Sequence, residues 1–191
     1  MNKIRKWLAE GDLTSDGRAN DVVQIINNNP EKIDDLLACL EDPDKVVRGH
    51  AADAMEKVGR EKPEIYLPHM HILLEIAIQD DLPMVQWHLA MLFGHLAIYE
   101  ALIDPIISVL LDLLTSVSAM TVTWSMASLC IIAKLHPDYS ARVLGEILQF
   151  EESTKVSIKS RSREIKQILL EDKPIPKHWV KSPAIQAKLE F

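Results

Sequence analysis

The chain has 191 residues, of which 48% are hydrophobic and 26% are charged, and its formal net charge is −7. This length and balance are ordinary for one soluble globular domain with a sizeable core. The middle of the sequence is acidic, and no Lys or Arg occurs between Lys62 and Lys134. Nucleic-acid affinity depends largely on basic groups that neutralise phosphates, so the sequence makes a nucleic-acid partner an unfavoured choice.

No segment is predicted to span a membrane or to direct secretion. The most apolar region, residues 89–114, is interrupted by Glu100, Asp104 and Asp112, whereas a spanning helix needs about 20 mostly apolar residues. At the N-terminus, acidic residues within positions 1–12 interrupt the chain before a signal-length apolar run can develop.

The two cysteines, Cys39 and Cys130, both fall inside apolar helical runs. A free thiol in such a run behaves as a small hydrophobic side chain and is usually buried. We therefore predict two reduced core residues and a cytoplasmic protein.

In chain order, two short helices are predicted first. Ile4, Trp7 and Leu8 have the i, i+3, i+4 spacing of one helix face. A second helix is expected to end at residues 27–30, where asparagines favour a turn and a proline restricts the residue before it. Because a terminal repeat must cap an array with a polar outer face, residues 1–29 are interpreted as a degenerate N-terminal capping pair.

After this pair, apolar periodicity predicts helical hairpins whose two helices are joined by short turns. The expected helices are residues 31–41 and 45–59, 66–79 and 83–98, 103–114 and 119–135, and a looser fourth pair after the break at 136–138. Residues 30–171 are thus predicted to be the repeats of one domain, residues 1–171. The proline-containing tail, residues 172–191, is treated as an extended segment, and whether it docks on the body is left open.

The second helices of these hairpins repeat one pattern. Aligning Val47 with Val85 and Val122 gives spacings of 38 and 37 residues. The alignment also places three alanines in register, namely Ala52, Ala90 and Ala127. Self-similarity at such a period is the sequence signature of a repeat array.

The period, the acidic or proline-bearing turns and the pattern Val-Arg-x-x-Ala-x-x-Ala-Met at residues 47–55 resemble HEAT repeats over about residues 30–170. The resemblance implies an all-α fold, an α-α superhelix or HEAT-like solenoid of about four to five helical hairpins. It also implies that second helices line the concave side. The later copies depart from the pattern, since Gln86 and Thr123 replace the arginine of Arg48.

The candidate site lies where copies of the pattern differ. Trp87 and Trp124 stand in the position of Gly49, and two exposed tryptophans there would be large, rigid anchors for a partner. The alternative that they simply pack between repeats as core stays open. The predicted partner-binding residues are Trp87, Met91, Trp124, Ser128 and Arg161.

HEAT arrays serve mostly as protein-binding scaffolds, although a fold does not fix a function. The resemblance therefore implies a non-catalytic scaffold that binds a protein or peptide through its concave face. The alternative is a HEAT-like DNA-alkylation glycosylase or nucleic-acid-binding repair protein, in which Trp87 and Trp124 stack on bases and Arg161 with Arg163 contacts phosphates. The acidic middle of the chain opposes that alternative.

No catalytic residue, metal site or cofactor is predicted. Nucleophile motifs and glycine-rich phosphate loops are missing from the sequence. His50 and His88 occupy equivalent repeat positions, but HEAT-like metal hydroxylases carry repeated His-Glu pairs, and Ala51 and Leu89 follow these histidines. Since a metal site needs three or four converging ligands, both histidines are interpreted as polar rim residues.

One basic cluster is expected on a helix near the C-terminus. Most such clusters are solvated faces. The other readings are an acidic partner, a phosphate, or the acidic middle of a second copy, because separated charges of opposite sign favour head-to-tail contact in a homodimer. The cluster consists of Lys155, Lys159, Arg161, Arg163 and Lys166.

Overall fold

The structure is a computed structural model that describes residues 3–190 of the chain. Throughout these residues the regular elements are helices, so the predicted all-helical fold is confirmed. They are α1 (Lys3–Leu8), α2 (Ala19–Asn28), α3 (Ile33–Leu37), α4 (Lys45–Glu61), α5 (Met70–Gln79), α6 (Pro83–His95), α7 (Ile103–Leu113), α8 (Ala119–Leu135), α9 (Ser140–Leu148), α10 (Val156–Leu170) and α11 (Pro183–Lys188).

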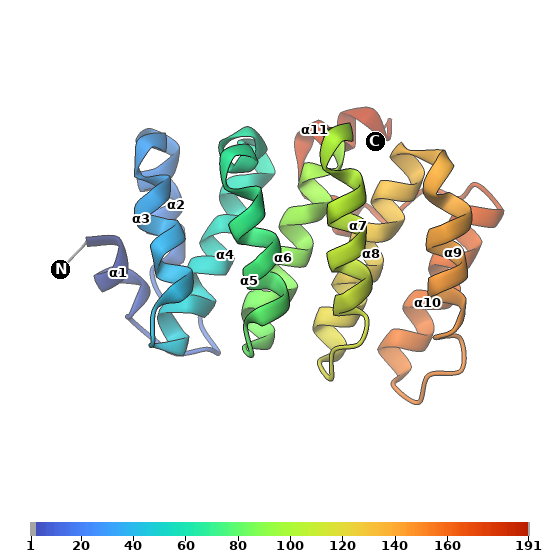
Figure 1. The fold of residues 1–191 in the computed structure, drawn as a ribbon, viewed down its shortest axis with the longest axis horizontal. Coiled ribbons are helices and arrows are strands. Elements are labelled where there is room, and N and C mark those ends of the chain that lie inside the picture. The colour runs from blue at the N-terminus through green and yellow to red at the C-terminus, as the bar shows by residue number, and fades with distance from the viewer. Residues whose placement is uncertain (1–2, 191) are drawn as a thin grey trace.

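The helices stand side by side in two layers along the long axis of the molecule (Figure 1). We call α3, α5, α7 and α9 the front layer, and α2, α4, α6, α8 and α10 the back layer. Each back-layer helix packs against the next one in the chain, from α2 through to α10. Short turns join each front helix to the back helix that follows it, so every hairpin contributes one helix to each layer.

Several expected front-layer helices are shorter than the periodicity predicts. The expected helix over residues 31–41 contains α3 flanked by two 3₁₀ turns, and residues 63–69 form a 3₁₀ turn before α5. Proline has no N–H to donate to a helix, and Pro68 lies inside that last turn. In the back layer, α8 spans residues 119–135 as expected.

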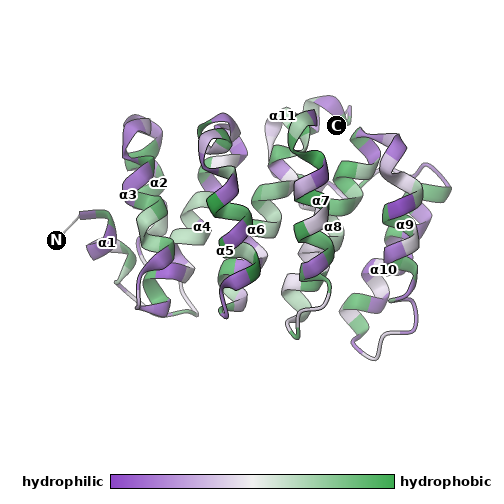
Figure 2. Cartoon of the chain, viewed as in Figure 1, coloured by the Kyte–Doolittle hydropathy of each residue, from purple (hydrophilic) through white to green (hydrophobic). Residues whose placement is uncertain are grey.

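The core follows the repeat pattern of the back-layer helices. Val47, Val85 and Val122 are at most 1% exposed, and the three aligned alanines are fully buried. In Figure 2 the front-layer helices α7 and α9 carry hydrophobic and hydrophilic residues on different sides, as expected for helices with one buried face. The apolar register read from the sequence is therefore the buried register of the structure.

The two cysteines belong to this core. Cys39 and Cys130 are both free and buried. Burial raises the pKa of the Cys39 thiol to about 11 and that of Cys130 to about 12. Because the thiolate is the reactive form, both side chains act as unreactive packing groups.

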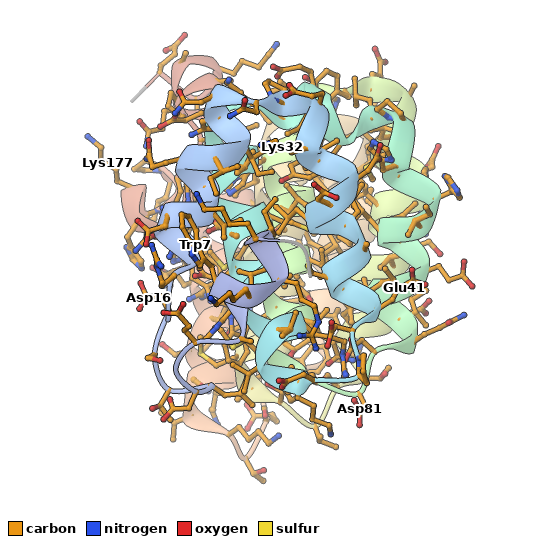
Figure 3. The ribbon with its side chains drawn as sticks, turned by 90° about the vertical axis from the view of Figure 1, so that its left-hand side faces the viewer. Trp7, Asp16, Lys32, Glu41, Asp81 and Lys177 are labelled. Carbon is orange, nitrogen blue, oxygen red and sulfur yellow. The ribbon has the colours of Figure 1, made fainter. Side chains whose placement is uncertain are left out.

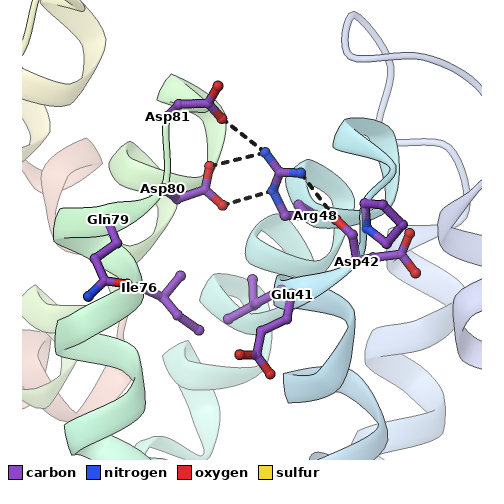
Figure 4. A pocket seen from close by; sticks show the side chains of 9 residues that line it. Glu41, Asp42, Arg48, Ile76, Gln79, Asp80 and Asp81 are labelled. Carbon is purple, nitrogen blue, oxygen red and sulfur yellow. Dashed lines mark hydrogen bonds and ion pairs between the residues drawn. The ribbon is translucent and has the colours of Figure 1, made fainter.

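Ion pairs join the turn within one hairpin to a helix that precedes that hairpin in the chain. Arg48 on α4 lies 2.9 Å from Asp80 and 3.0 Å from Asp81 in the turn before α6 (Figure 4). Arg5 on α1 makes the corresponding contact with Asp42, at 2.6 Å. Arg48 also lines a cavity of about 360 Å³ between these turns. The arginine of the repeat pattern therefore holds neighbouring hairpins together.

His50 ties the N-terminal segment to α4, and its prediction as a polar rim residue was wrong because the side chain is fully buried. Its Nδ1 lies 2.8 Å from the carbonyl oxygen of Leu8. Its Nε2 lies 2.8 Å from that of Ser15 and 3.0 Å from that of Asp12. Carbonyl oxygens only accept hydrogen bonds, so His50 binds this segment through whichever ring nitrogen carries a proton.

Replacing His50 with leucine should therefore destabilise the fold, because buried carbonyl groups would lose their donors. We expect the free energy of unfolding to fall by about 2 kcal/mol or more, measured by urea denaturation. His71→Leu is the matched control, since His71 is exposed on α5, and it should change stability little. Equal stabilities of the two variants would contradict the role assigned to His50.

Candidate functional site

The C-terminal segment, residues 172–190, covers part of the back layer. We call the surface of the back layer that points away from the front layer the back face. Figure 3 shows Lys177 of the segment on this side of the molecule, across the back layer from α3. Further along the segment, α11 packs against α4. The segment thus leaves α10 and returns across the back layer towards the N-terminal half of the chain.

Docking of the C-terminal segment, which the sequence left open, is therefore observed, and the segment contains α11 instead of being extended throughout. Its buried side chains are at most 3% exposed. They are Ile175, Trp179, Val180, Ser182 and Ile185. Four of these five side chains are apolar, and their number in a short tail is the signal that could have predicted docking.

Arg161 lies between two tryptophans on the back face. Its guanidinium carbon is 4.0 Å from the ring centroid of Trp179 and 5.9 Å from that of Trp124. One guanidinium nitrogen donates to the carbonyl oxygen of Thr123, at 3.0 Å. Burial lowers the pKa of Arg161, but a guanidinium in a protein stays charged. Arg161 and Trp124, both predicted site residues, are thus brought together around a tryptophan of the C-terminal segment.

Lys181 makes a second cation–π contact between the C-terminal segment and the back layer. Its ammonium nitrogen lies 5.2 Å from the ring centroid of Trp124, within the range of a cation–π interaction. Burial lowers the pKa of Lys181, and the carboxylates of Glu56 and Asp53 oppose that change more than the cations of α4 support it. The lysine therefore lies over an aromatic ring, close to the paired charges of α4.

A buried charge cluster on α4 and α6 lies next to this contact. Glu56 is fully buried, and its carboxylate is bound by Arg60 and by Nε2 of His95, at 2.9 Å from the histidine. Burial alone would raise the pKa of Glu56, but the hydrogen bonds from His95 and Arg60 hold it at about 2. The i, i+4 spacing of Glu56 and Arg60 was visible in the sequence, whereas the contact with His95 joins different hairpins.

Trp87 is held by its neighbour on α6. Its indole Nε1 donates to Nε2 of His88 at 3.3 Å, while Nδ1 of His88 lies 2.8 Å from the carbonyl oxygen of Met84. Burial lowers the pKa of His88, which agrees with a neutral ring that donates through Nδ1 and accepts through Nε2. The indole of Trp87 is half-buried, so part of it remains exposed on the back layer.

Met91 and Ser128, also predicted as partner contacts, are buried between helices. Their exposed fractions are 5% and 2%. The hydroxyl of Ser128 on α8 donates to the carbonyl oxygen of Ala90 on α6, at 2.7 Å. A Cβ atom at Gly94 would lie 2.7 Å from the Ser128 oxygen, so the glycine permits this close approach. Both side chains therefore pack between helices and are not available as partner contacts.

The predicted basic cluster is divided in the structure. Lys159 and Arg163 pair with Glu152, at 3.2 and 3.6 Å, and Lys166 pairs with Glu151 at 3.1 Å. Lys155 is exposed and donates to the backbone of the turn before α8. Arg161 is separate from these side chains, because it binds Thr123 and Trp179. The exposed members are thus partly neutralised by acidic residues of the preceding loop.

Residues 3–190 contain neither a membrane-spanning helix nor a metal-binding cluster. No helix there combines the length and the apolar character needed to cross a membrane. The same residues contain no group of three or more His, Cys, Asp or Glu side chains that could hold a metal ion. No protein-family model and no curated protein matches this chain.

The Glu56 cluster should contribute a pH dependence to stability. The pKa of Glu56 in the folded chain, about 2, lies below its ordinary value of 4.5. The ionised carboxylate therefore stabilises the fold above pH 4.5, and this stabilisation is lost as the pH falls from 4.5 to about 2. Glu56→Gln should remove up to about 3 kcal/mol of this pH-dependent change, measured by urea denaturation at several pH values.

Glu75→Gln is the control for that measurement. Glu75 is an exposed carboxylate on α5, so its loss should leave the slope of stability against pH nearly unchanged. The assignment fails if the slopes of the two variants between pH 4.5 and pH 2 agree with each other and with the unsubstituted chain.

Proposed function

We propose that this chain is a HEAT-like α-solenoid whose back face is the concave side, and that it is a non-catalytic scaffold that binds a protein or peptide on this face. The arrangement of the back layer supports the architecture, since the second helices of successive hairpins lie next to one another in chain order. The repeat spacing of 37 to 38 residues in the sequence supports it as well.

The observation that carries the proposed function is that the back face holds a peptide segment of the chain itself. The side chains of Trp179, Val180 and Ile185 are buried on it, and each lies in a stretch that crosses the layer instead of belonging to a hairpin. A surface that buries large aromatic and aliphatic side chains of a segment outside the hairpins has the properties of a peptide-binding surface.

The proposed contact residues are those that reach the surface of the back face. Trp124 and Arg161 are included because both contact the C-terminal segment. Trp87 is included because its indole is half-buried on the adjacent helix. Aromatic and arginine side chains dominate binding energy at protein interfaces, which supports this choice.

The buried, unreactive thiols support the proposed cytoplasmic location, since reduced cysteines are typical of that compartment.

The repair-enzyme alternative is less well supported by the arrangement of basic groups. Arg161, one of its two expected phosphate contacts, lies against Trp179. Arg163, the other, lies 3.6 Å from Glu152. Because neither guanidinium is presented alone on the surface, we do not propose a nucleic-acid substrate.

A peptide-display selection on the full-length protein tests the scaffold proposal. Selected peptides should bind Trp124→Ala and Arg161→Gln at least about tenfold more weakly, as expected for interface hot spots. Circular dichroism and melting temperature should show that both variants remain folded. Trp7→Ala is the matched control, because Trp7 lies at the N-terminal end of the molecule, with Arg18 3.8 Å from its ring centroid (Figure 3).

Equal binding by Trp124→Ala, Arg161→Gln and the unsubstituted chain would exclude the back face as the binding site. A selection that yields no peptide on either the unsubstituted protein or the Trp179→Ala variant would count against the scaffold function itself. Salt-dependent binding to duplex DNA, in place of peptide binding, would instead support the repair-enzyme alternative.

A further inference from the structure

Residues 174–190 of the C-terminal segment lie on the back face without hydrogen bonds to it, whereas Asp172 at the start of the segment pairs with Lys134 of α8. Beyond Lys173, the hydrogen bonds of the described segment are internal, such as those from the amide of Trp179 to the carbonyl of Pro176 and from the side chain of Gln186 to the carbonyl of Val180. No hydrogen bond joins residues 174–190 to residues 3–173. Release of residues 174–190 would therefore break no hydrogen bond to residues 3–173.

Two polar atoms of the segment are buried without a hydrogen-bond partner in the described part of the chain. They are the indole Nε1 of Trp179 and the hydroxyl of Ser182. Both residues are at most 2% exposed. Burying an unpaired donor opposes docking, because the group exchanges water for no partner. Docking is therefore weaker than the buried apolar area of the segment alone would suggest.

The contacts that hold the helices of the back layer together are of a different kind. Ser128 donates to the backbone of the neighbouring helix at 2.7 Å, and Arg161 does so at 3.0 Å. Glu56 and His95 are joined in the same way across two hairpins, at 2.9 Å. The back layer can thus keep its own contacts when the segment leaves.

We propose that the C-terminal segment is an internal ligand that reversibly closes the back face, and that the partner is a peptide segment with the same order of side chains. That order is an aromatic residue, a basic residue two positions later and an aliphatic residue four positions after that, as in Trp179, Lys181 and Ile185. The inference rests on the proposed function, because it names the class of peptide that the scaffold binds.

Each position of this pattern follows from a contact of the segment. The flat guanidinium of Arg161, 4.0 Å from the Trp179 ring centroid, selects an aromatic side chain. The ring of Trp124, with the Lys181 ammonium 5.2 Å from its centroid, selects a cation. The fully buried position of Ile185, on the helix that packs against α4, selects an aliphatic side chain.

The experiment compares full-length proteins that differ in how firmly the segment is held. The probe is a fluorescein-labelled peptide with the sequence of residues 173–188, KPIPKHWVKSPAIQAK. It should bind Trp179→Ala at least about tenfold more tightly than the unsubstituted protein, because a closed site lowers the apparent affinity by the fraction that is open. Fluorescence anisotropy measures the affinities, and circular dichroism checks the helical fold.

Lys181→Glu provides a second route to the open state, since it replaces the cation over the Trp124 ring with a negative charge, and it should also strengthen binding of the probe. Lys177→Ala is the matched control, because Lys177 is exposed on the same segment, and it should bind the probe as the unsubstituted protein does. A probe peptide with alanine in place of its tryptophan should bind none of the proteins tightly.

The results of this binding experiment distinguish failure of the internal-ligand proposal from failure of the proposed scaffold function. Equal probe affinity for the unsubstituted protein, Trp179→Ala and Lys181→Glu would overturn reversible closure while leaving the back face as a binding site. No binding to either open variant would overturn the proposed peptide pattern, and the display selection would still decide whether the face binds other peptides. A stable dimer that Trp179→Ala dissociates, seen by analytical ultracentrifugation, would overturn closure within one chain.

Discussion

Successive helices of the back layer approach each other closely at a row of small residues, and the arrangement of the other elements depends on this packing. Ala52, Ala90 and Ala127 are fully buried at equivalent positions of α4, α6 and α8. The hydroxyl of Ser128 reaches the backbone of α6 only because the two helices are this near. Larger side chains in the row would separate the helices, and close-packed interiors tolerate such changes poorly.

The same packing determines what the back face can present. The side chains of the aligned alanines are buried between helices, whereas Trp124 and Arg161 contact the C-terminal segment. Polar contacts between neighbouring helices, such as that of Glu56 with His95, keep the layer in one register without help from the segment. A rigid layer with adjacent aromatic and charged groups is a suitable support for the proposed peptide site.

The sequence predicted the helices better than it predicted the site. Periodic apolar residues and turn residues were sufficient to place α8, and a repeated pattern was sufficient to identify the buried valines. Met91 and Ser128 were misplaced because a helical wheel considers one helix, whereas α6 packs against α4, α5, α7 and α8 together. His50 was misjudged because its partners are carbonyl groups at the end of α1 and in the loop after it, and a repeat pattern says nothing of them.

The C-terminal segment was the least predictable part, since it loses the repeat pattern of the hairpins and residues 174–190 have no hydrogen bond to residues 3–173. Its burial depends on a surface to which α4, α8 and α10 contribute together, and no local rule describes such a surface. Docking of Trp179 against Arg161 is therefore the central claim to test in solution. Fluorine NMR of the full-length protein labelled with 5-fluorotryptophan, with the Trp179 resonance assigned by Trp179→Phe, tests it most directly. We expect a Trp179 resonance that is nearly insensitive to exchange of H₂O for D₂O and to a soluble paramagnetic agent, because the side chain is 2% exposed. Sensitivity as large as that in the urea-unfolded protein would contradict the account.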